Sequence, residues 1–108
     1  MDKDKLYLQH IVEAVGKIRE YTKGITLEEF KANTLIQDGV IRKLEIIGEA
    51  SRMISENTKK LHQDIPWYEI SGMRNRLIHE YFGVDLDAVW KTISEDLDIL
   101  IEKFNQTA

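Results

Sequence analysis

The sequence predicts an all-α protein, an antiparallel bundle of four to five helices, and three observations support this fold class. The 108 residues include one proline and six glycines, so few residues interrupt a helix. Leucine, isoleucine, glutamate and lysine are abundant, a composition that favours helices. Apolar residues recur at intervals of three and four, the period of a helix with one buried face. Because this length suits one domain, we expect residues 1–108 to form a single bundle.

The first helix is predicted from Lys3 to Tyr21, and Gly24 is a suitable stop after it. Thr26 and Glu29 then match a capping box, in which each side chain accepts a backbone N–H of the other residue. A short helix follows to about Ala32. The apolar stripe of the first helix, which should face the core, consists of Leu8, Ile11, Val12, Val15 and Ile18.

A long helix is predicted to begin at Asn33 or Thr34 and to end near Lys59. Two further apolar residues lie off its core stripe, on the same side as Arg42 and Glu49, and they are Ile46 and Met53. This second apolar face indicates either a contact surface for a dimer partner or two ordinary exposed side chains. The core stripe itself consists of Ile36, Val40, Leu44, Ile47, Ala50, Ser51 and Ile54.

A loop from about Leu61 to Pro66 leads to a helix predicted over Trp67–Phe82, since proline suits the first turn of a helix. Gly83 ends this helix, and Asp85 is positioned to cap the last one. The last helix carries its apolar residues on one side: Leu86, Val89, Trp90, Ile93, Leu97, Leu100, Ile101 and Phe104. Short links between the predicted helices favour antiparallel neighbours.

Charge and composition limit the function classes. A net charge of −4 counts against a large basic surface for nucleic acid, although it allows a small basic pocket. The absence of cysteine excludes disulfides and thiolate zinc sites and fits a reducing compartment. The N-terminus lacks the apolar stretch of a signal peptide, and no apolar run approaches the roughly 18 residues of a membrane span. We therefore expect a cytoplasmic protein that does not enter a membrane.

The segment from Arg74 to Tyr81 carries the residues with the clearest chemistry. Arg74 offers a guanidinium fork that fits a phosphate. His79 can transfer protons near neutral pH, because the unperturbed pKa of histidine is about 6.5. Tyr81 supplies a hydroxyl, and Asn75 lies one helical turn before His79. This residue set is able to cleave RNA without a metal, because RNA carries its own nucleophile, the 2′-hydroxyl.

Helical geometry places these residues on different faces. Ile70 and Tyr81 belong to the predicted core stripe, and Arg74 lies only about 40° from Ile70 at 100° per residue. His79 points about 140° away from Arg74 on an ideal helix. One monomer brings the two together only if Arg74 bends round or the helix is distorted. A two-fold dimer is the alternative, because it would let two such helices line one cleft.

Each residue also has an ordinary structural interpretation. A histidine on a polar face is commonly a surface residue, and a tyrosine on a core stripe commonly serves packing. Trp67 and Trp90 are predicted to be core or interface anchors and not platforms for bases. Glu49 is expected to be a solvated charge; its functional alternatives are the border of a dimer cleft, which is favoured, and a pairing with Arg74 inside one monomer. No histidine pair has metal-ligand spacing, so no metal site is predicted.

Three segments together resemble the HepT-like ribonuclease toxins of the HEPN superfamily. The first runs from Leu44 to Ala50, the second from Ile65 to Asn75, and the third from His79 to Trp90. The Arg-x4-His-x-Tyr motif within them, Arg74 to Tyr81, is complete. The resemblance implies a HEPN-like bundle that forms a two-fold dimer, with the motif helices at the dimer cleft.

The same resemblance implies a function. HepT-like proteins are expected to be metal-independent endoribonucleases without a cofactor, the toxin halves of toxin–antitoxin modules. Arg74 and His79 would be the catalytic residues, with Asn75 and Tyr81 in support. The expected partner is a minimal nucleotidyltransferase antitoxin that neutralises the toxin by adding AMP to Tyr81. The alternative is a non-catalytic nucleotide-binding or adaptor subunit that acts with the nucleotidyltransferase.

Overall fold

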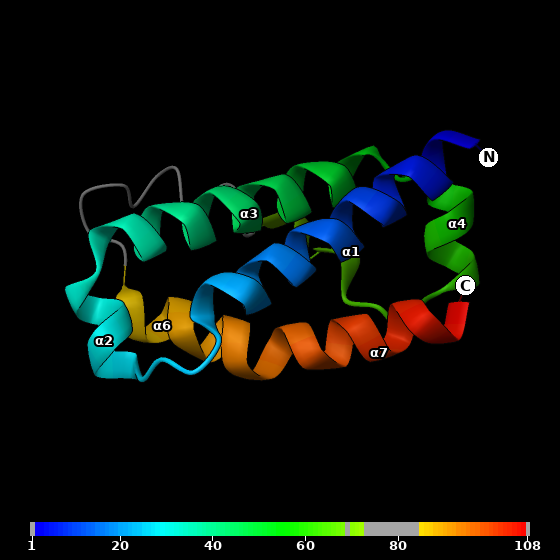
Figure 1. Ribbon diagram of the computed structural model, residues 1–108. Helices are drawn as coiled ribbons and strands as arrows, with labels where there is room; N and C mark the ends of the chain where they lie inside the picture. The colour runs from blue at the N-terminus through cyan, green and yellow to red at the C-terminus, as the bar shows by residue number, and fades with distance from the viewer. Residues whose placement is uncertain (1, 69, 73–84, 108) are drawn as a thin grey trace.

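The computed structural model describes residues 2–68, 70–72 and 85–107, and every regular element in these ranges is helical (Figure 1). This confirms the all-α fold class. The helices, in chain order, are α1 (Asp2–Thr22), α2 (Leu27–Ala32), α3 (Thr34–Met53), α4 (Glu56–Leu61), α6 (Leu86–Lys91) and α7 (Leu97–Thr107), with a π-helical turn over Thr92–Asp96 between the last two.

The three long helices lie side by side, and α1 runs antiparallel to the other two. Figure 1 shows α1 and α3 running in opposite directions, with α7 along the lower edge in the same direction as α3. Helix α1 packs against both α3 and α7, and α2 contacts α3 and α6 at one end of the bundle. Both chain ends lie beside α4 at the other end. Within the described residues, none of the helices is long and apolar enough to cross a membrane.

The first two helices form largely as the sequence predicts. Gly24 has a φ of +74°, the left-handed conformation that glycine adopts most easily after a helix end. The capping box is present, because the Glu29 N–H donates to the Thr26 hydroxyl and the Thr26 N–H donates to the Glu29 carboxylate. The predicted core position of Val12 is wrong, since its side chain is 41% exposed and Ala14 is buried instead. Val12 lies about 100° round the helix from Ile11, at the margin of the buried face.

The predicted long helix from Thr34 to Lys59 is in fact two helices, because α3 ends at Met53. Ile54 is extended, with φ −72° and ψ 137°, and its side chain is buried. Ser55 then caps α4, and its hydroxyl accepts the Thr58 N–H at 3.3 Å. A serine favours such caps over helix interiors, because its hydroxyl competes for nearby backbone groups.

A buried aspartate holds this junction to the start of α1. Asp4 is only 7% exposed, and its carboxylate accepts the Ser55 N–H at 2.9 Å, the Ser55 hydroxyl at 2.5 Å and the Thr58 hydroxyl at 2.6 Å. These hydrogen bonds, led by the one from the Ser55 hydroxyl, hold the pKa of Asp4 well below its ordinary value. The first turn of α1 thereby fixes the direction in which α4 leaves α3.

We expect Asp4→Ala to lower the free energy of unfolding by about 2–3 kcal/mol, because three donors lose a charged acceptor in a buried place. Urea unfolding followed by circular dichroism measures this. Asp38→Ala, which removes an exposed carboxylate on α3, is the matched control and should cost less than about 0.5 kcal/mol. Equal losses in the two variants would show that the Asp4 network does not stabilise the fold.

The Asp4 contribution should also depend on pH. Because the pKa of Asp4 is lower in the folded state, its contribution is complete above the unfolded pKa of about 3.9 and declines as the pH falls below that value. The stability difference between wild type and Asp4→Ala should therefore be smaller at about pH 3 than at pH 7. A difference that stays constant over this range would contradict the assignment.

The last predicted helix is continuous but contains the π-helical turn Thr92–Asp96. Asp85 caps its start as predicted, accepting the N–H groups of Asp87 and Ala88. The Thr92 and Ser94 hydroxyls donate to carbonyls four residues back, which loosens the regular helical ladder in this turn. Its apolar side nevertheless stays in the core as far as the side chains are described, with Val89, Ile93, Leu97 and Leu100 buried. The side chain of Phe104 lies outside the described ones.

The motif helix is the helix predicted over Trp67–Phe82, and its described start is anchored in the core. Ile65 and Ile70 are buried, and the Ile70 N–H donates to the Pro66 carbonyl at 3.1 Å, so the helix begins where the proline predicts. Trp67 is buried too, and its indole N–H donates to the His62 carbonyl at 3.0 Å. This confirms Trp67 as a core anchor. Trp90 is half-buried and lies 5.3 Å from the Phe30 ring, centroid to centroid.

Candidate functional site

The residues predicted to carry the chemistry are Arg74, Asn75, His79 and Tyr81, and all four lie outside the described residues. Their positions in the chain are bracketed by described segments, with residues 70–72 on one side and the Asp85 cap of α6 on the other. Two hollows in the described surface border α3, and both contain charged side chains.

The first hollow, the α1–α3 groove, has a volume of about 310 Å³. It confirms that the off-stripe residues of α3 share one side of the molecule, since Arg42, Ile46, Glu49 and Met53 all line it. Helix α1 contributes Tyr7 and His10, whose rings meet edge to face with centroids 6.4 Å apart. The complete lining is Tyr7, His10, Arg42, Glu45, Ile46, Glu49, Ala50 and Met53.

An exposed apolar residue at each end extends this face along α3. Met53 is 53% exposed and Leu35 is 82% exposed. The two are 18 residues apart, five full helical turns, so they lie on one side of α3. Leu35 was not among the residues that the sequence assigned to this face.

Ile46 is partly buried and packs against the core, so it links this face to the interior. Glu49 is exposed, as predicted, and its carboxylate lies 3.7 Å from the Arg52 guanidinium.

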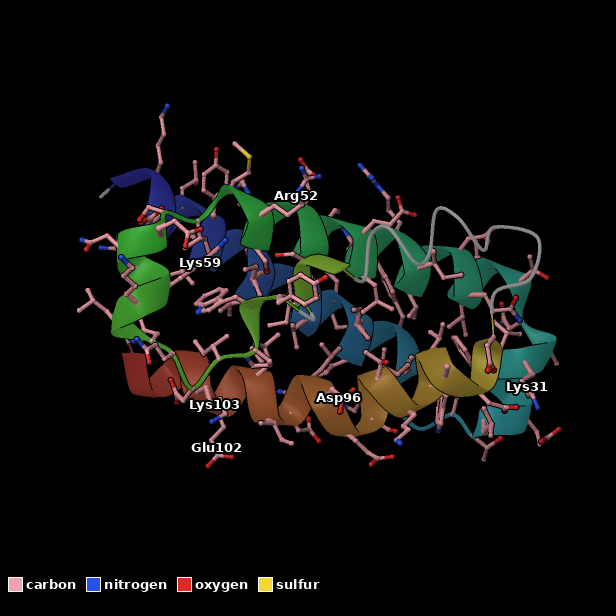
Figure 2. All side chains as sticks on the ribbon, turned by 180° about the vertical axis from the view of Figure 1, so that it is seen from behind. Lys31, Arg52, Lys59, Asp96, Glu102 and Lys103 are labelled. Atoms are coloured by element: carbon pink, nitrogen blue, oxygen red, sulfur yellow. The ribbon has the colours of Figure 1, made fainter. Side chains whose placement is uncertain are left out.

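The second hollow, the Tyr68 groove, has a volume of about 520 Å³ and opens beside the first turn of the motif helix. Helices α3 and α4 supply Arg52, Glu56 and Lys59, and the motif helix supplies Trp67, Tyr68 and Ser71. Figure 2 shows Arg52 on α3 and Lys59 on α4, on the side of the molecule that faces away in Figure 1. Two cations and an exposed aromatic ring therefore surround one hollow.

The Tyr68 groove was not predicted from the sequence. Arg52 and Lys59 were expected on one continuous helix, where residues seven apart share a face. The break at Ile54 instead places them on two helices that line the groove together. Tyr68 directly follows the buried Trp67. On a helix its side chain is turned by about 100° from that of Trp67, and this offset was the sequence signal for its exposure.

Among the residues that the structure describes, no three histidine, aspartate or glutamate side chains are grouped as a metal site would require. The chemistry that these hollows offer is recognition by charge and by ring contact. Arginine and lysine bind phosphate oxygens, and an exposed tyrosine ring stacks on a nucleobase.

Comparison with known proteins gives a consistent result. The family model described as "Ribonuclease HepT-like" matches residues 11–107. A Thermococcus cleftensis protein named "Probable ribonuclease HepT" is 49% identical over 94% of this chain and 93% of its own length. A Methanocaldococcus jannaschii protein named "putative RNase" is 45% identical over 86% of this chain and 85% of its own length.

Another protein of Methanocaldococcus jannaschii is named as a gamma-glutamylcyclotransferase and "putative RNase". It is 43% identical over 95% of this chain, which spans 47% of that longer protein. No solved structure gives a significant match to this chain.

Proposed function

Because this chain belongs to the HepT-like ribonuclease family, we propose that it is a metal-independent endoribonuclease, the toxin of a toxin–antitoxin module. The observation that carries the proposal is the complete Arg74 to Tyr81 motif within a match that covers residues 11–107. The substrate is RNA, the chemistry needs no cofactor, and the protein acts in the cytoplasm as one domain.

The mechanism follows from the residue types. His79 takes the proton of the 2′-hydroxyl or protonates the leaving oxygen, and its pKa range suits both tasks. Arg74 stabilises the charge that develops on the phosphate. Asn75 orients the imidazole or binds a phosphate oxygen. The products are a cyclic phosphate on one fragment and a free 5′-hydroxyl on the other.

A cleavage assay tests this function. We expect labelled RNA to be cut by the purified protein in EDTA, because the proposed groups are all supplied by protein and substrate. Failure of cleavage under these conditions, with nucleotide binding retained, would instead favour a nucleotide-binding or adaptor subunit that acts with the nucleotidyltransferase.

The proposed active form is a homodimer. Leu35 and Met53 expose apolar side chains on one side of α3, with Arg42 and Glu49 between them. A surface with exposed apolar ends and charges of both signs suits a two-fold contact, in which each residue of one copy meets its counterpart region on the other. Such a contact would allow two motif helices to build one shared site.

We expect light scattering to give a dimer at micromolar concentration and Met53→Asp to shift the protein toward monomer, because the change places a charge in the contact. Leu61→Asp is the matched control, since Leu61 is 73% exposed on α4 and outside this face. A monomeric wild type would contradict the shared site, and so would a Met53→Asp variant that remains a dimer.

A further inference from the structure

We propose that the Tyr68 groove binds one nucleotide of single-stranded RNA, with the base stacked on Tyr68 and the phosphate held by Arg52 and Lys59. The inference rests on the ribonuclease function proposed above and deepens it by assigning a substrate subsite outside the motif. The groove volume of about 520 Å³ falls within the roughly 300–1,000 Å³ of small-molecule sites.

The exposed ring is the first reason. Tyr68 is 87% exposed, whereas the preceding Trp67 is buried and hydrogen-bonded to the His62 carbonyl. The tryptophan therefore fixes the backbone from which the tyrosine projects into solvent. An exposed ring alone would be an ordinary surface residue. Here it borders a hollow that also contains two cations, and stacking on an aromatic ring is the common way in which proteins hold unpaired RNA bases.

The two cations are the second reason. The Arg52 guanidinium lies 3.7 Å from the Glu49 carboxylate, and the Lys59 ammonium lies 3.8 Å from the Glu56 carboxylate. Both separations exceed the roughly 2.7–2.9 Å of a strong charged hydrogen bond. Pairs of this kind between residues three apart on a helix contribute little, so a phosphate can replace them. The Lys59 side chain is largely covered, which directs its ammonium group and reduces the entropy lost on binding.

One residue of the Tyr68 groove, Glu56, should weaken RNA binding, and its replacement gives an additional test. Glu56 adds a negative charge to the lining and has an exposed side chain. Because its charge repels a phosphate, its removal should strengthen RNA binding. A groove that served only packing, or that bound a basic protein surface, would not show this gain.

The short distance in sequence between the groove residues and the motif is the third reason. Tyr68 and Ser71 belong to the described start of the motif helix, and Arg74 follows Ser71 by three residues in sequence. This closeness in sequence is the ground on which we place the bound nucleotide and the phosphate to be cleaved in one strand. The subsite would anchor the strand beside the reacting bond, a task that binding groups remote from the chemistry commonly perform.

The experiment measures binding separately from cleavage. Fluorescence anisotropy with a short, mixed-sequence 2′-fluoro RNA, which lacks the nucleophilic hydroxyl, gives the Kd of each variant. Tyr68→Ala should weaken binding by about 5- to 150-fold, which corresponds to the loss of one stacked base. Tyr68→Phe should bind like wild type, because it keeps the ring. Glu56→Gln should bind more tightly than wild type.

The salt dependence identifies the phosphate contacts. Arg52→Ala and Lys59→Ala should each reduce the slope of log K against log salt by about 0.7, the value for one phosphate contact on a single strand. Lys60→Ala is the matched control. It removes the same charge from the same helix, but Lys60 does not line the groove, so the slope should stay near that of wild type.

Two outcomes would overturn the subsite. One is an unchanged Kd for Tyr68→Ala together with slopes that match the Lys60 control. The other is normal RNA binding by these variants combined with loss of binding to the nucleotidyltransferase, which would assign the groove to a protein partner. A wild type that binds the 2′-fluoro RNA through these residues yet cleaves no all-ribose RNA would keep the subsite and reject the nuclease.

Discussion

Replacing His79 with alanine should lower the rate of RNA cleavage by about 100- to 10,000-fold, to the background of the assay, because the reaction loses its proton-transfer group. The measurement is the single-turnover rate on labelled RNA in EDTA. His62→Ala is the matched control, because the His62 backbone carbonyl, which holds the Trp67 indole, is retained in that variant. The control should cleave at nearly the wild-type rate.

Arg74→Ala should reduce cleavage as strongly, by about 100- to 1,000-fold, because the developing phosphate charge loses its stabilising group. It should also lower the stability somewhat, since Arg74 lies beside the predicted core stripe, where its side-chain stem contributes packing. Arg74→Lys keeps the charge but loses the fork, so it should recover only part of the rate. Wild-type cleavage by the His79 variant would reject the mechanism, whatever the Arg74 variants do.

Local signals in the sequence were sufficient for much of the fold. The Thr26 and Glu29 capping box, the Gly24 stop and the Asp85 cap all form as predicted. Each depends on groups within about four residues, so the sequence contains all the information required. The apolar stripes were predictable for the same reason, since helical spacing alone decides which residues share a face.

Features that depend on contacts between distant residues were not predictable. At the break after Met53, Ser55 donates to Asp4, which is 51 residues away in the sequence. No sequence pattern near Ser55 indicates that Asp4 is its partner. The apolar stripe of the predicted long helix also continues through Ile54. The Tyr68 groove has the same origin, because it requires α3, α4 and the motif helix to meet. For the site, the residue types were enough to predict the chemistry. The two grooves could not be predicted, because they arise from tertiary packing.

Changing Tyr81 to phenylalanine should leave a folded and largely active nuclease that escapes neutralisation by the nucleotidyltransferase. The proposed modification needs the phenolic oxygen as its acceptor, and phenylalanine removes that oxygen while it keeps the ring. On the wild type, each AMP group adds bulk and negative charge close to His79 in sequence, which would repel the RNA phosphate.

Incubation with the nucleotidyltransferase and ATP, followed by intact-mass measurement and a cleavage assay, tests this regulation. Wild type should gain the mass of one or more AMP groups and lose activity, whereas Tyr81→Phe should gain no mass and stay active. Tyr68→Phe is the matched control, because it removes an exposed tyrosine hydroxyl elsewhere on the chain and should be modified like wild type. Equal adducts on wild type and Tyr81→Phe would place the modified residue elsewhere. Loss of the adduct in Tyr68→Phe alone would assign it to the Tyr68 groove, and the regulation would then act by blocking the RNA subsite directly.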